Sequence, residues 1–288
     1  RDTQNGCKNT AVGYQSMLDA TSADCNVALG AYSLANNTTA DLNTALGACS
    51  MYTNGTGANN VAVGYSSLYS TTGSNNTAVG LNALVSSQGT NDSTAIGMRA
   101  LCSQTTGSNN TSVGYSSMCG VTTGVCNTSI GRLSGRITST GNNNASLGYD
   151  ANPSAFGSNN QITLGNSNNT NLRCADTSIS TLSDLRDKTN VEDIPHGLDY
   201  ILALRPVKFD WETRDGSRKG KKDYGFIAQE LDKVETDFGS AEYTKLVHKD
   251  NPEKWEADPM KTYPILIKAI QELKTQNDNL ITRIETLE

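Results

Sequence analysis

Ser183 and Lys188 lie five residues apart in the segment Ser-Asp-Leu-Arg-Asp-Lys and carry a hydroxyl and an amine that could act together in nucleophilic catalysis. A serine attacks a carbonyl when a neighbouring base accepts its proton, and a neutral lysine amine can be that base. Arg186 lies between them and, as a nearby cation, could favour the neutral amine. Alone the pair is weak evidence for catalysis, because Ser183 could equally cap a turn and Lys188 could be solvated.

Regular secondary structure would keep the two side chains apart. Five residues separate them by ~140° around a helix and by about 16 Å along a strand. A bend in the chain or a neighbouring subunit must therefore supply the contact. In either arrangement the two side chains would meet, and the reaction would begin, only after folding or assembly.

The residues that follow this pair predict a small α+β domain. Residues 197–204 have helical spacing and end before Pro206, and residues 207–211 alternate as a strand. Residues 224–231 pass from a strand into an amphipathic helix. The basic cluster at 218–222 is expected at a solvated hairpin tip, and less often such a cluster contacts an acidic partner.

A heptad pattern after Pro264 predicts a terminal coiled-coil helix. Its seam consists of Leu266, Ile270, Leu273, Asn277, Leu280, Ile284 and Leu287. Ile at position a, Leu at position d and a buried Asn favour two strands by themselves. We expect this face to be an assembly surface.

Four motifs of this part resemble the C-terminal intramolecular chaperone, auto-processing domain of phage tailspikes, tail fibres and endosialidases. They are Ser183 to Lys188, Leu198 to Trp211, Tyr224 to Leu231 and Tyr263 to Lys274, and they span residues 183–288 in the expected order. The resemblance implies self-cleavage between Leu182 and Ser183. It makes Ser183 the nucleophile and Lys188 the base of a serine–lysine dyad, acting once on its own chain with no external substrate.

A 17-residue repeat organises the first part of the chain. Units that begin as Asn-x-Ala-Val/Leu-Gly, and later vary at the Asn, Ala and Val/Leu positions, align on ten glycines at intervals of 17, with one interval of 16. The aligned glycines are Gly13, Gly30, Gly47, Gly64, Gly80, Gly97, Gly114, Gly131, Gly148 and Gly165. Short strands separated by Thr-Gly-Ser-Asn-Asn turns predict a parallel β-solenoid, so the chain is expected to be mainly β.

Two apolar columns recur in each coil, and we expect both to point inward. The first lies just before the glycine and contains Val12, Leu29, Leu46, Val63, Val79, Ile96, Val113, Ile130, Leu147 and Leu164. The second lies after it and contains Met17, Leu34, Met51, Leu68, Leu84, Leu101 and Met118. The glycine itself is expected at a backbone bend or a close approach between backbones.

Over residues 5–166 the units resemble the head repeats of trimeric autotransporter adhesins and similar repeats in phage tail fibres. This resemblance implies a homotrimeric parallel β-roll. The predicted domains are a β-roll at 1–166, an extended connector at 167–182 and a chaperone domain at 183–288.

Cys102 and Cys119 occupy the same position, five residues after the glycine, in neighbouring coils. A disulfide between them is geometrically feasible. Buried small apolar side chains are the favoured interpretation, because cysteine is among the most often buried residues. The cysteine spacings include neither C-x-x-C nor a Cys/His arrangement, so no metal and no cofactor is expected.

Several function classes have little support. A net charge of -6 gives no reason to expect a nucleic-acid partner, and no apolar run is long enough for membrane insertion. The favoured interpretation is a phage tail-fibre or tailspike segment of the virion, assembled in the host cytoplasm, that attaches to a host-surface glycan or protein receptor. The alternatives are a bacterial trimeric surface adhesin and a glycan-degrading tailspike, although the seven Asp residues before Ser183 form no paired setting.

Overall fold

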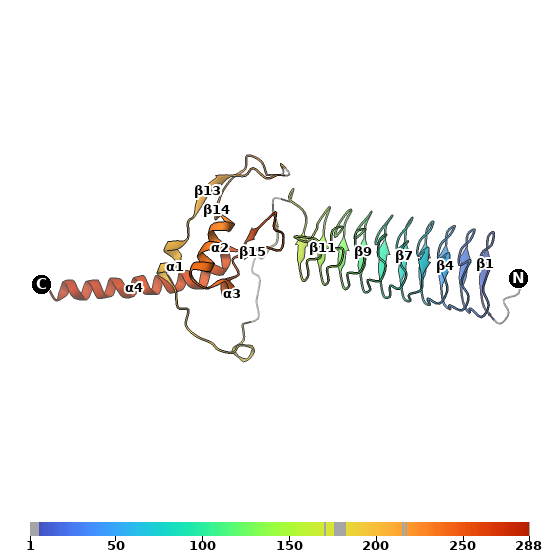
Figure 1. Ribbon diagram of the computed structural model, residues 1–288, viewed down its shortest axis with the longest axis horizontal. Helices are drawn as coiled ribbons and strands as arrows, with labels where there is room; N and C mark the ends of the chain where they lie inside the picture. The colour runs from blue at the N-terminus through green and yellow to red at the C-terminus, as the bar shows by residue number, and fades with distance from the viewer. Residues whose placement is uncertain (1–5, 170, 176–182, 215, 217, 288) are drawn as a thin grey trace. The chain divides into compact units, whose positions relative to one another are not determined.

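The computed structural model describes residues 6–169, 171–175, 183–214, 216 and 218–287 (Figure 1). The chain divides into two compact units, Arg1–Asn169 and Thr170–Glu288. The first is built from repeated short strands, and the second contains the helices. Each unit is described by itself.

The first unit is a parallel β-solenoid, as the 17-residue period predicts (Figure 1). Its ten strands stack in one sheet, with each residue paired one coil further on, as Ala28 pairs with Ala45. The strands are β1 (Thr10–Val12), β2 (Val27–Leu29), β3 (Thr44–Leu46), β5 (Val61–Val63), β7 (Thr77–Val79), β8 (Thr94–Ile96), β9 (Thr111–Val113), β10 (Thr128–Ile130), β11 (Ala145–Leu147) and β12 (Ile162–Leu164). The short strands β4 (Thr53–Asn54) and β6 (Ser70–Thr71) form a separate parallel pair.

The repeated glycine serves both structural purposes expected of it. Gly13 has a φ of +134°, which side-chain-bearing residues rarely adopt. A Cβ atom at Gly13 would also lie 2.5 Å from the carbonyl oxygen of Gly30 in the next coil. The bend and the close backbone approach therefore coincide at one position, which explains why the repeat needs glycine there.

Only one of the two predicted inward columns is inside the coil. The column after the glycine is buried, and its residues are at most 4% exposed. The column before it points outward, contrary to the prediction, as in Leu46 at 42% and Val12 at 55% exposure. The reason is that a three-residue strand turns its first and third side chains to one face and its middle one to the other. The middle position is Ala, Ser or Thr, and from β2 to β11 this small side chain lies inside the coil, where the Ala residues pack against the buried Leu or Met column.

A ladder of buried asparagines connects successive coils. The side-chain oxygen of Asn43 accepts a hydrogen bond from the backbone N–H of Asn60, at 2.9 Å. Its side-chain amide donates to the carbonyl oxygen of Gly57, also at 2.9 Å. Equivalent bonds recur at Asn26, Asn60, Asn110 and Asn127. In these repeats the first residue thereby satisfies backbone groups that the coil would otherwise bury unpaired.

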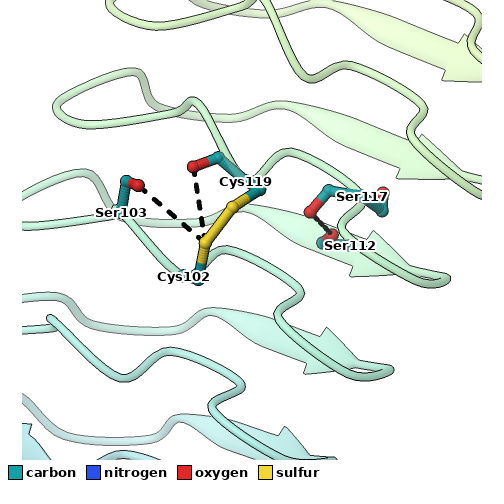
Figure 2. The surroundings of a disulfide bond; sticks show 5 residues. All are labelled: Cys102, Ser103, Ser112, Ser117 and Cys119. Atoms are coloured by element: carbon teal, nitrogen blue, oxygen red, sulfur yellow. Dashed lines mark hydrogen bonds between the residues drawn. A yellow bond between two sulfur atoms is a disulfide. The ribbon is translucent and has the colours of Figure 1, made fainter.

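Cys102 and Cys119 form a disulfide, which corrects the favoured interpretation of two buried thiols. Figure 2 shows the bond joining two adjacent coils. In-register stacking places the two Cα atoms 4.9 Å apart, within the usual range for a disulfide. The remaining cysteines within the described residues are free thiols.

The second unit is a small α+β arrangement with a long terminal helix. Its elements are the 3-10 turn η1 (Leu185–Asp187), α1 (Leu198–Ala203), β13 (Val207–Asp210), β14 (Lys222–Gly225), α2 (Ala228–Asp237), α3 (Ala241–Thr244), β15 (Val247–His248), β16 (Glu256–Ala257), η2 (Pro259–Thr262) and α4 (Tyr263–Glu285). Strands β13 and β14 form an antiparallel hairpin, and so do β15 and β16. A core of Tyr200, Leu231, Val234, Leu246 and Ile265 joins α1, α2 and the start of α4.

The heptad face of α4 is exposed over most of its length. Ile265 and Ala269 are buried against the domain. The predicted seam is open, as in Leu273 at 49% and Ile284 at 58% exposure. Among the described residues, no helix combines the length and apolar character needed to cross a membrane.

Candidate functional site

The short turn η1 brings Ser183 and Lys188 together. The Lys188 Nζ lies 2.7 Å from the Ser183 Oγ and donates a hydrogen bond to it. Two backbone hydrogen bonds form the turn, from Asp187 N–H to the Asp184 carbonyl at 3.2 Å and from Lys188 N–H to the Leu185 carbonyl at 3.1 Å. Of the two arrangements that the spacing left open, a bend and a neighbouring subunit, the structure contains the bend.

Asp184 caps this turn with its side chain. Its Oδ1 accepts a hydrogen bond from the backbone N–H of Arg186 at 2.9 Å. The same carboxylate accepts hydrogen bonds from the Arg186 Nε at 3.1 Å and from the Arg186 Nη2 at 2.5 Å. The spacing predicts Arg186 as a cation beside Lys188, whereas its guanidinium forms an ion pair with Asp184.

This ion pair changes the titration of both partners. The side-chain and backbone hydrogen bonds from Arg186 hold the pKa of Asp184 below its ordinary value. The hydrogen bond to Asp184 raises the pKa of Arg186. Asp184 is therefore ionised and Arg186 protonated at neutral pH, and the pair as a whole carries no net charge.

The site is open to solvent. Ser183 and Lys188 are both exposed, and Asp184 is half-buried. Water can therefore reach the serine oxygen, as hydrolysis of an ester on that oxygen would require. Leu182, which precedes Ser183 at the predicted cleavage site, lies outside the described residues.

The basic cluster at 218–222 lies in the connection between β13 and β14. The Arg218 guanidinium lies 4.1 Å from the centre of the Trp211 ring and 3.4 Å from the Asp223 carboxylate. Lys219 forms an ion pair with Glu212. Two cations of the basic cluster, Arg218 and Lys219, are thus already paired within the hairpin.

Two carboxylates of the second unit have structural roles that the sequence did not reveal. Glu272 of α4 accepts a hydrogen bond from the backbone N–H of Leu198 at 2.7 Å and so caps the start of α1. The buried Glu235 of α2 accepts hydrogen bonds from the Thr244 hydroxyl and the Leu246 N–H, both at 2.6 Å. Glu272 and Leu198 are 74 residues apart in the chain, so no local pattern could have identified this contact. The Asp184 cap, by contrast, has a local signal, because an Asp two residues before a turn N–H is a common capping arrangement.

Comparison with known proteins finds one similarity, in the second unit. Residues 183–240 match the family model described as chaperone of endosialidase. The match covers about a fifth of the chain and begins at Ser183 itself. No curated protein and no solved structure matches the chain significantly. The family match supports the predicted intramolecular chaperone in the second unit.

Proposed function

We propose that the chain is a segment of a phage tail fibre or tailspike whose C-terminal domain, residues 183–288, is an intramolecular trimerisation chaperone that releases itself by cleavage between Leu182 and Ser183. Residues 1–166 form the β-roll of the fibre, and residues 167–182 connect it to the chaperone. The observation that carries the proposal is the 2.7 Å contact between Lys188 and Ser183, located at the first residue of the chaperone family match.

In the proposed reaction, the Ser183 hydroxyl is the nucleophile and the Lys188 amine is the base. The amine accepts the hydroxyl proton while Oγ forms a bond to the Leu182 carbonyl carbon. The bond from that carbon to the Ser183 nitrogen then breaks, and the nitrogen receives a proton and becomes the new amino terminus. Water hydrolyses the resulting ester, which returns the Ser183 hydroxyl and leaves a carboxylate on Leu182.

Two exposed apolar surfaces support assembly with further copies of the same chain. The first is the outward column of the solenoid, which contains aliphatic residues in ten successive coils. The second is the heptad face of α4. A long row of exposed aliphatic side chains is unusual on a monomer and is typical of an interface. The family resemblance supports a homotrimer, although the heptad pattern with its Asn277 favours two strands by itself.

A chaperone within the same chain suits this architecture. Each coil pairs with neighbours 16 or 17 residues away, and the first unit has no independent large core beyond its narrow inner columns. Parallel pairing among several chains is slow, and it leaves strand edges exposed during folding. A domain that gathers the chains at one end would reduce that delay, and it is no longer needed once the roll has formed.

The proposed virion location and host attachment follow from the tail-fibre assignment. The test of the cleavage is the intact mass of the purified protein, compared with that of Ser183→Ala and Lys188→Ala variants. We expect two fragments divided at Leu182 and Ser183 for the wild type, and one full-length species for each variant. A single full-length species in the wild type would remove self-cleavage from the proposal.

Co-expression of Ser183→Ala and Lys188→Ala chains distinguishes a dyad within one chain from a dyad shared between two chains. The 2.7 Å contact lies within one chain, so we expect no cleavage in the mixture. Cleaved product in the mixture, with none from either variant alone, would require a dyad shared between subunits.

A further inference from the structure

The structure assigns Asp184 and Arg186 as positioning residues: their ion pair, with the Asp184 cap on the Arg186 N–H, closes the turn that places Lys188 against Ser183. This inference rests on the proposed self-cleavage and adds to it the residues that hold the dyad in reach. Neither residue contacts the Ser183 oxygen, so neither is assigned a chemical role in the reaction.

We call the Asp184–Arg186 ion pair together with the Asp184 cap the clamp. The turn needs this clamp because it is very short. It contains three residues, and single 3-10 turns have poor hydrogen-bond geometry and little stability of their own. Both of its backbone hydrogen bonds are longer than 3.0 Å, and its residues bury no side chain. Without it, Ser183 and Lys188 would be separated by up to about 16 Å of extended chain. The contact between them therefore depends on whatever keeps these three residues folded.

Asp184 holds the turn at two levels. Its Oδ1 is bonded to the backbone N–H of Arg186, which fixes the chain direction at the start of the turn. Both carboxylate oxygens are also bonded to the Arg186 guanidinium, which draws the side chain back over the turn. A carboxylate engaged by both the backbone and a fork of guanidinium donors is held in one orientation, as a single exposed ion pair would not be.

Asp187 supplies a matched control within the same turn. It is one residue from Lys188 and carries the same charge as Asp184, and its carboxylate makes no ion pair within the described residues. A substitution at Asp187 therefore changes the charge near the dyad without removing the clamp. A substitution at Asp184 changes both.

The first experiment measures the rate at which full-length chain is lost, by intact mass over time, in Asp184→Ala, Asp184→Asn, Arg186→Ala and Asp187→Ala variants. We expect Asp184→Ala to slow cleavage about tenfold or more, since a capping side chain and a charged hydrogen-bonded pair are both lost. Asp184→Asn should recover part of that loss, because its amide oxygen can still accept from the Arg186 N–H. The cleavage rate of Arg186→Ala should lie between those of Asp184→Ala and Asp184→Asn. The rate of Asp187→Ala should stay within about twofold of the wild-type rate. Equal slowing by Asp184→Ala and Asp187→Ala, or no slowing by Asp184→Ala, would overturn the assignment.

The second experiment does not depend on cleavage. In a Ser183→Ala background, hydrogen exchange of the Asp187 and Lys188 amides reports the turn directly, because both donate to carbonyls inside it. Adding Asp184→Ala should speed their exchange about fivefold after correction for intrinsic rates, and adding Asp184→Asn should speed it less. Unchanged exchange on adding Asp184→Ala would contradict the clamp even if cleavage slowed. If the wild type does not cleave at all, the proposed function fails, and the exchange experiment still decides whether Asp184 holds the turn.

Discussion

The outward apolar column of the solenoid leads to a sharp prediction about assembly. Leu46 belongs to this column and is 42% exposed in the single chain. Leu18 has the same side chain and the same 42% exposure, but it lies five residues after Gly13, outside the column. Asp substitutions at Leu46 and Leu18 therefore make a matched pair, and only the Leu46 change should disturb a trimer.

The expected effect follows from the exposed fraction. Complete burial of a leucine contributes ~2 kcal/mol, so covering the exposed 42% of Leu46 contributes about 1 kcal/mol per copy and about 3 kcal/mol in a trimer. Burying an unpaired carboxylate adds a penalty of several kcal/mol per ion. Three copies of Leu46→Asp should together weaken assembly by roughly 10 kcal/mol or more, enough to dissociate a trimer of ordinary affinity at micromolar concentration.

Light scattering after size-exclusion chromatography, at several protein concentrations, measures the result. A Ser183→Ala background keeps the sample uniform if cleavage occurs. We expect the mass of three chains for the parent and for Leu18→Asp, and a much lower mass or misassembled material for Leu46→Asp. Equal masses for Leu46→Asp and the parent would refute the assignment of this column to an interface. A stable monomeric parent would refute the trimer itself.

Three further predictions concern the stability of the two units. Replacing Cys102 and Cys119 together by Ser should lower the free energy of unfolding by about 3 kcal/mol, the chain-entropy value for a loop of this length, as measured by denaturant titration. Asn43→Ala should destabilise the solenoid by about 3 kcal/mol in the same assay, because it leaves a buried N–H and a buried carbonyl of neighbouring coils without partners. The Arg205 hydrogen bond lowers the pKa of Glu230 below its ordinary 4.5, so this pair stabilises the second unit above pH 4.5 and the contribution is lost as pH falls through the lowered value. Glu230→Gln should therefore flatten the decline of thermal stability below pH 4.5, as measured by circular dichroism.

Two controls keep these outcomes interpretable. Cys126 is a free thiol, so Cys126→Ser should leave the free energy of unfolding within about 0.5 kcal/mol of the parent. A reducing agent should reproduce the Cys102 and Cys119 double substitution in the parent and have no further effect in that variant. An unchanged midpoint in both experiments would contradict a stabilising disulfide.

The match of residues 183–240 to the chaperone of endosialidase family could be predicted because the motifs that carry the resemblance are local and ordered. The Ser183 to Lys188 segment and the motifs after it are short stretches whose residue types carry the resemblance, and the matched region begins at the same serine. The pairing of Asp184 with Arg186 does not follow from the sequence, although the two residues are only two positions apart. Charge and spacing along the chain do not specify which of two neighbouring groups a guanidinium will bond.

The sequence by itself determined the period and the parallel solenoid, because a 17-residue repeat must place equivalent residues one above another. Tertiary structure decided which side of the strand faces inward. Val and Leu are the more apolar residues, but the narrow coil accommodates the small middle side chain, so the aliphatic column lies outside. Stacking also allows Cys102 and Cys119 to form a disulfide, since the distance between adjacent coils sets the 4.9 Å separation of their Cα atoms. Hydrophobicity and spacing are properties of the linear sequence. The width of a coil and the distance between stacked coils depend on how successive coils pack against each other.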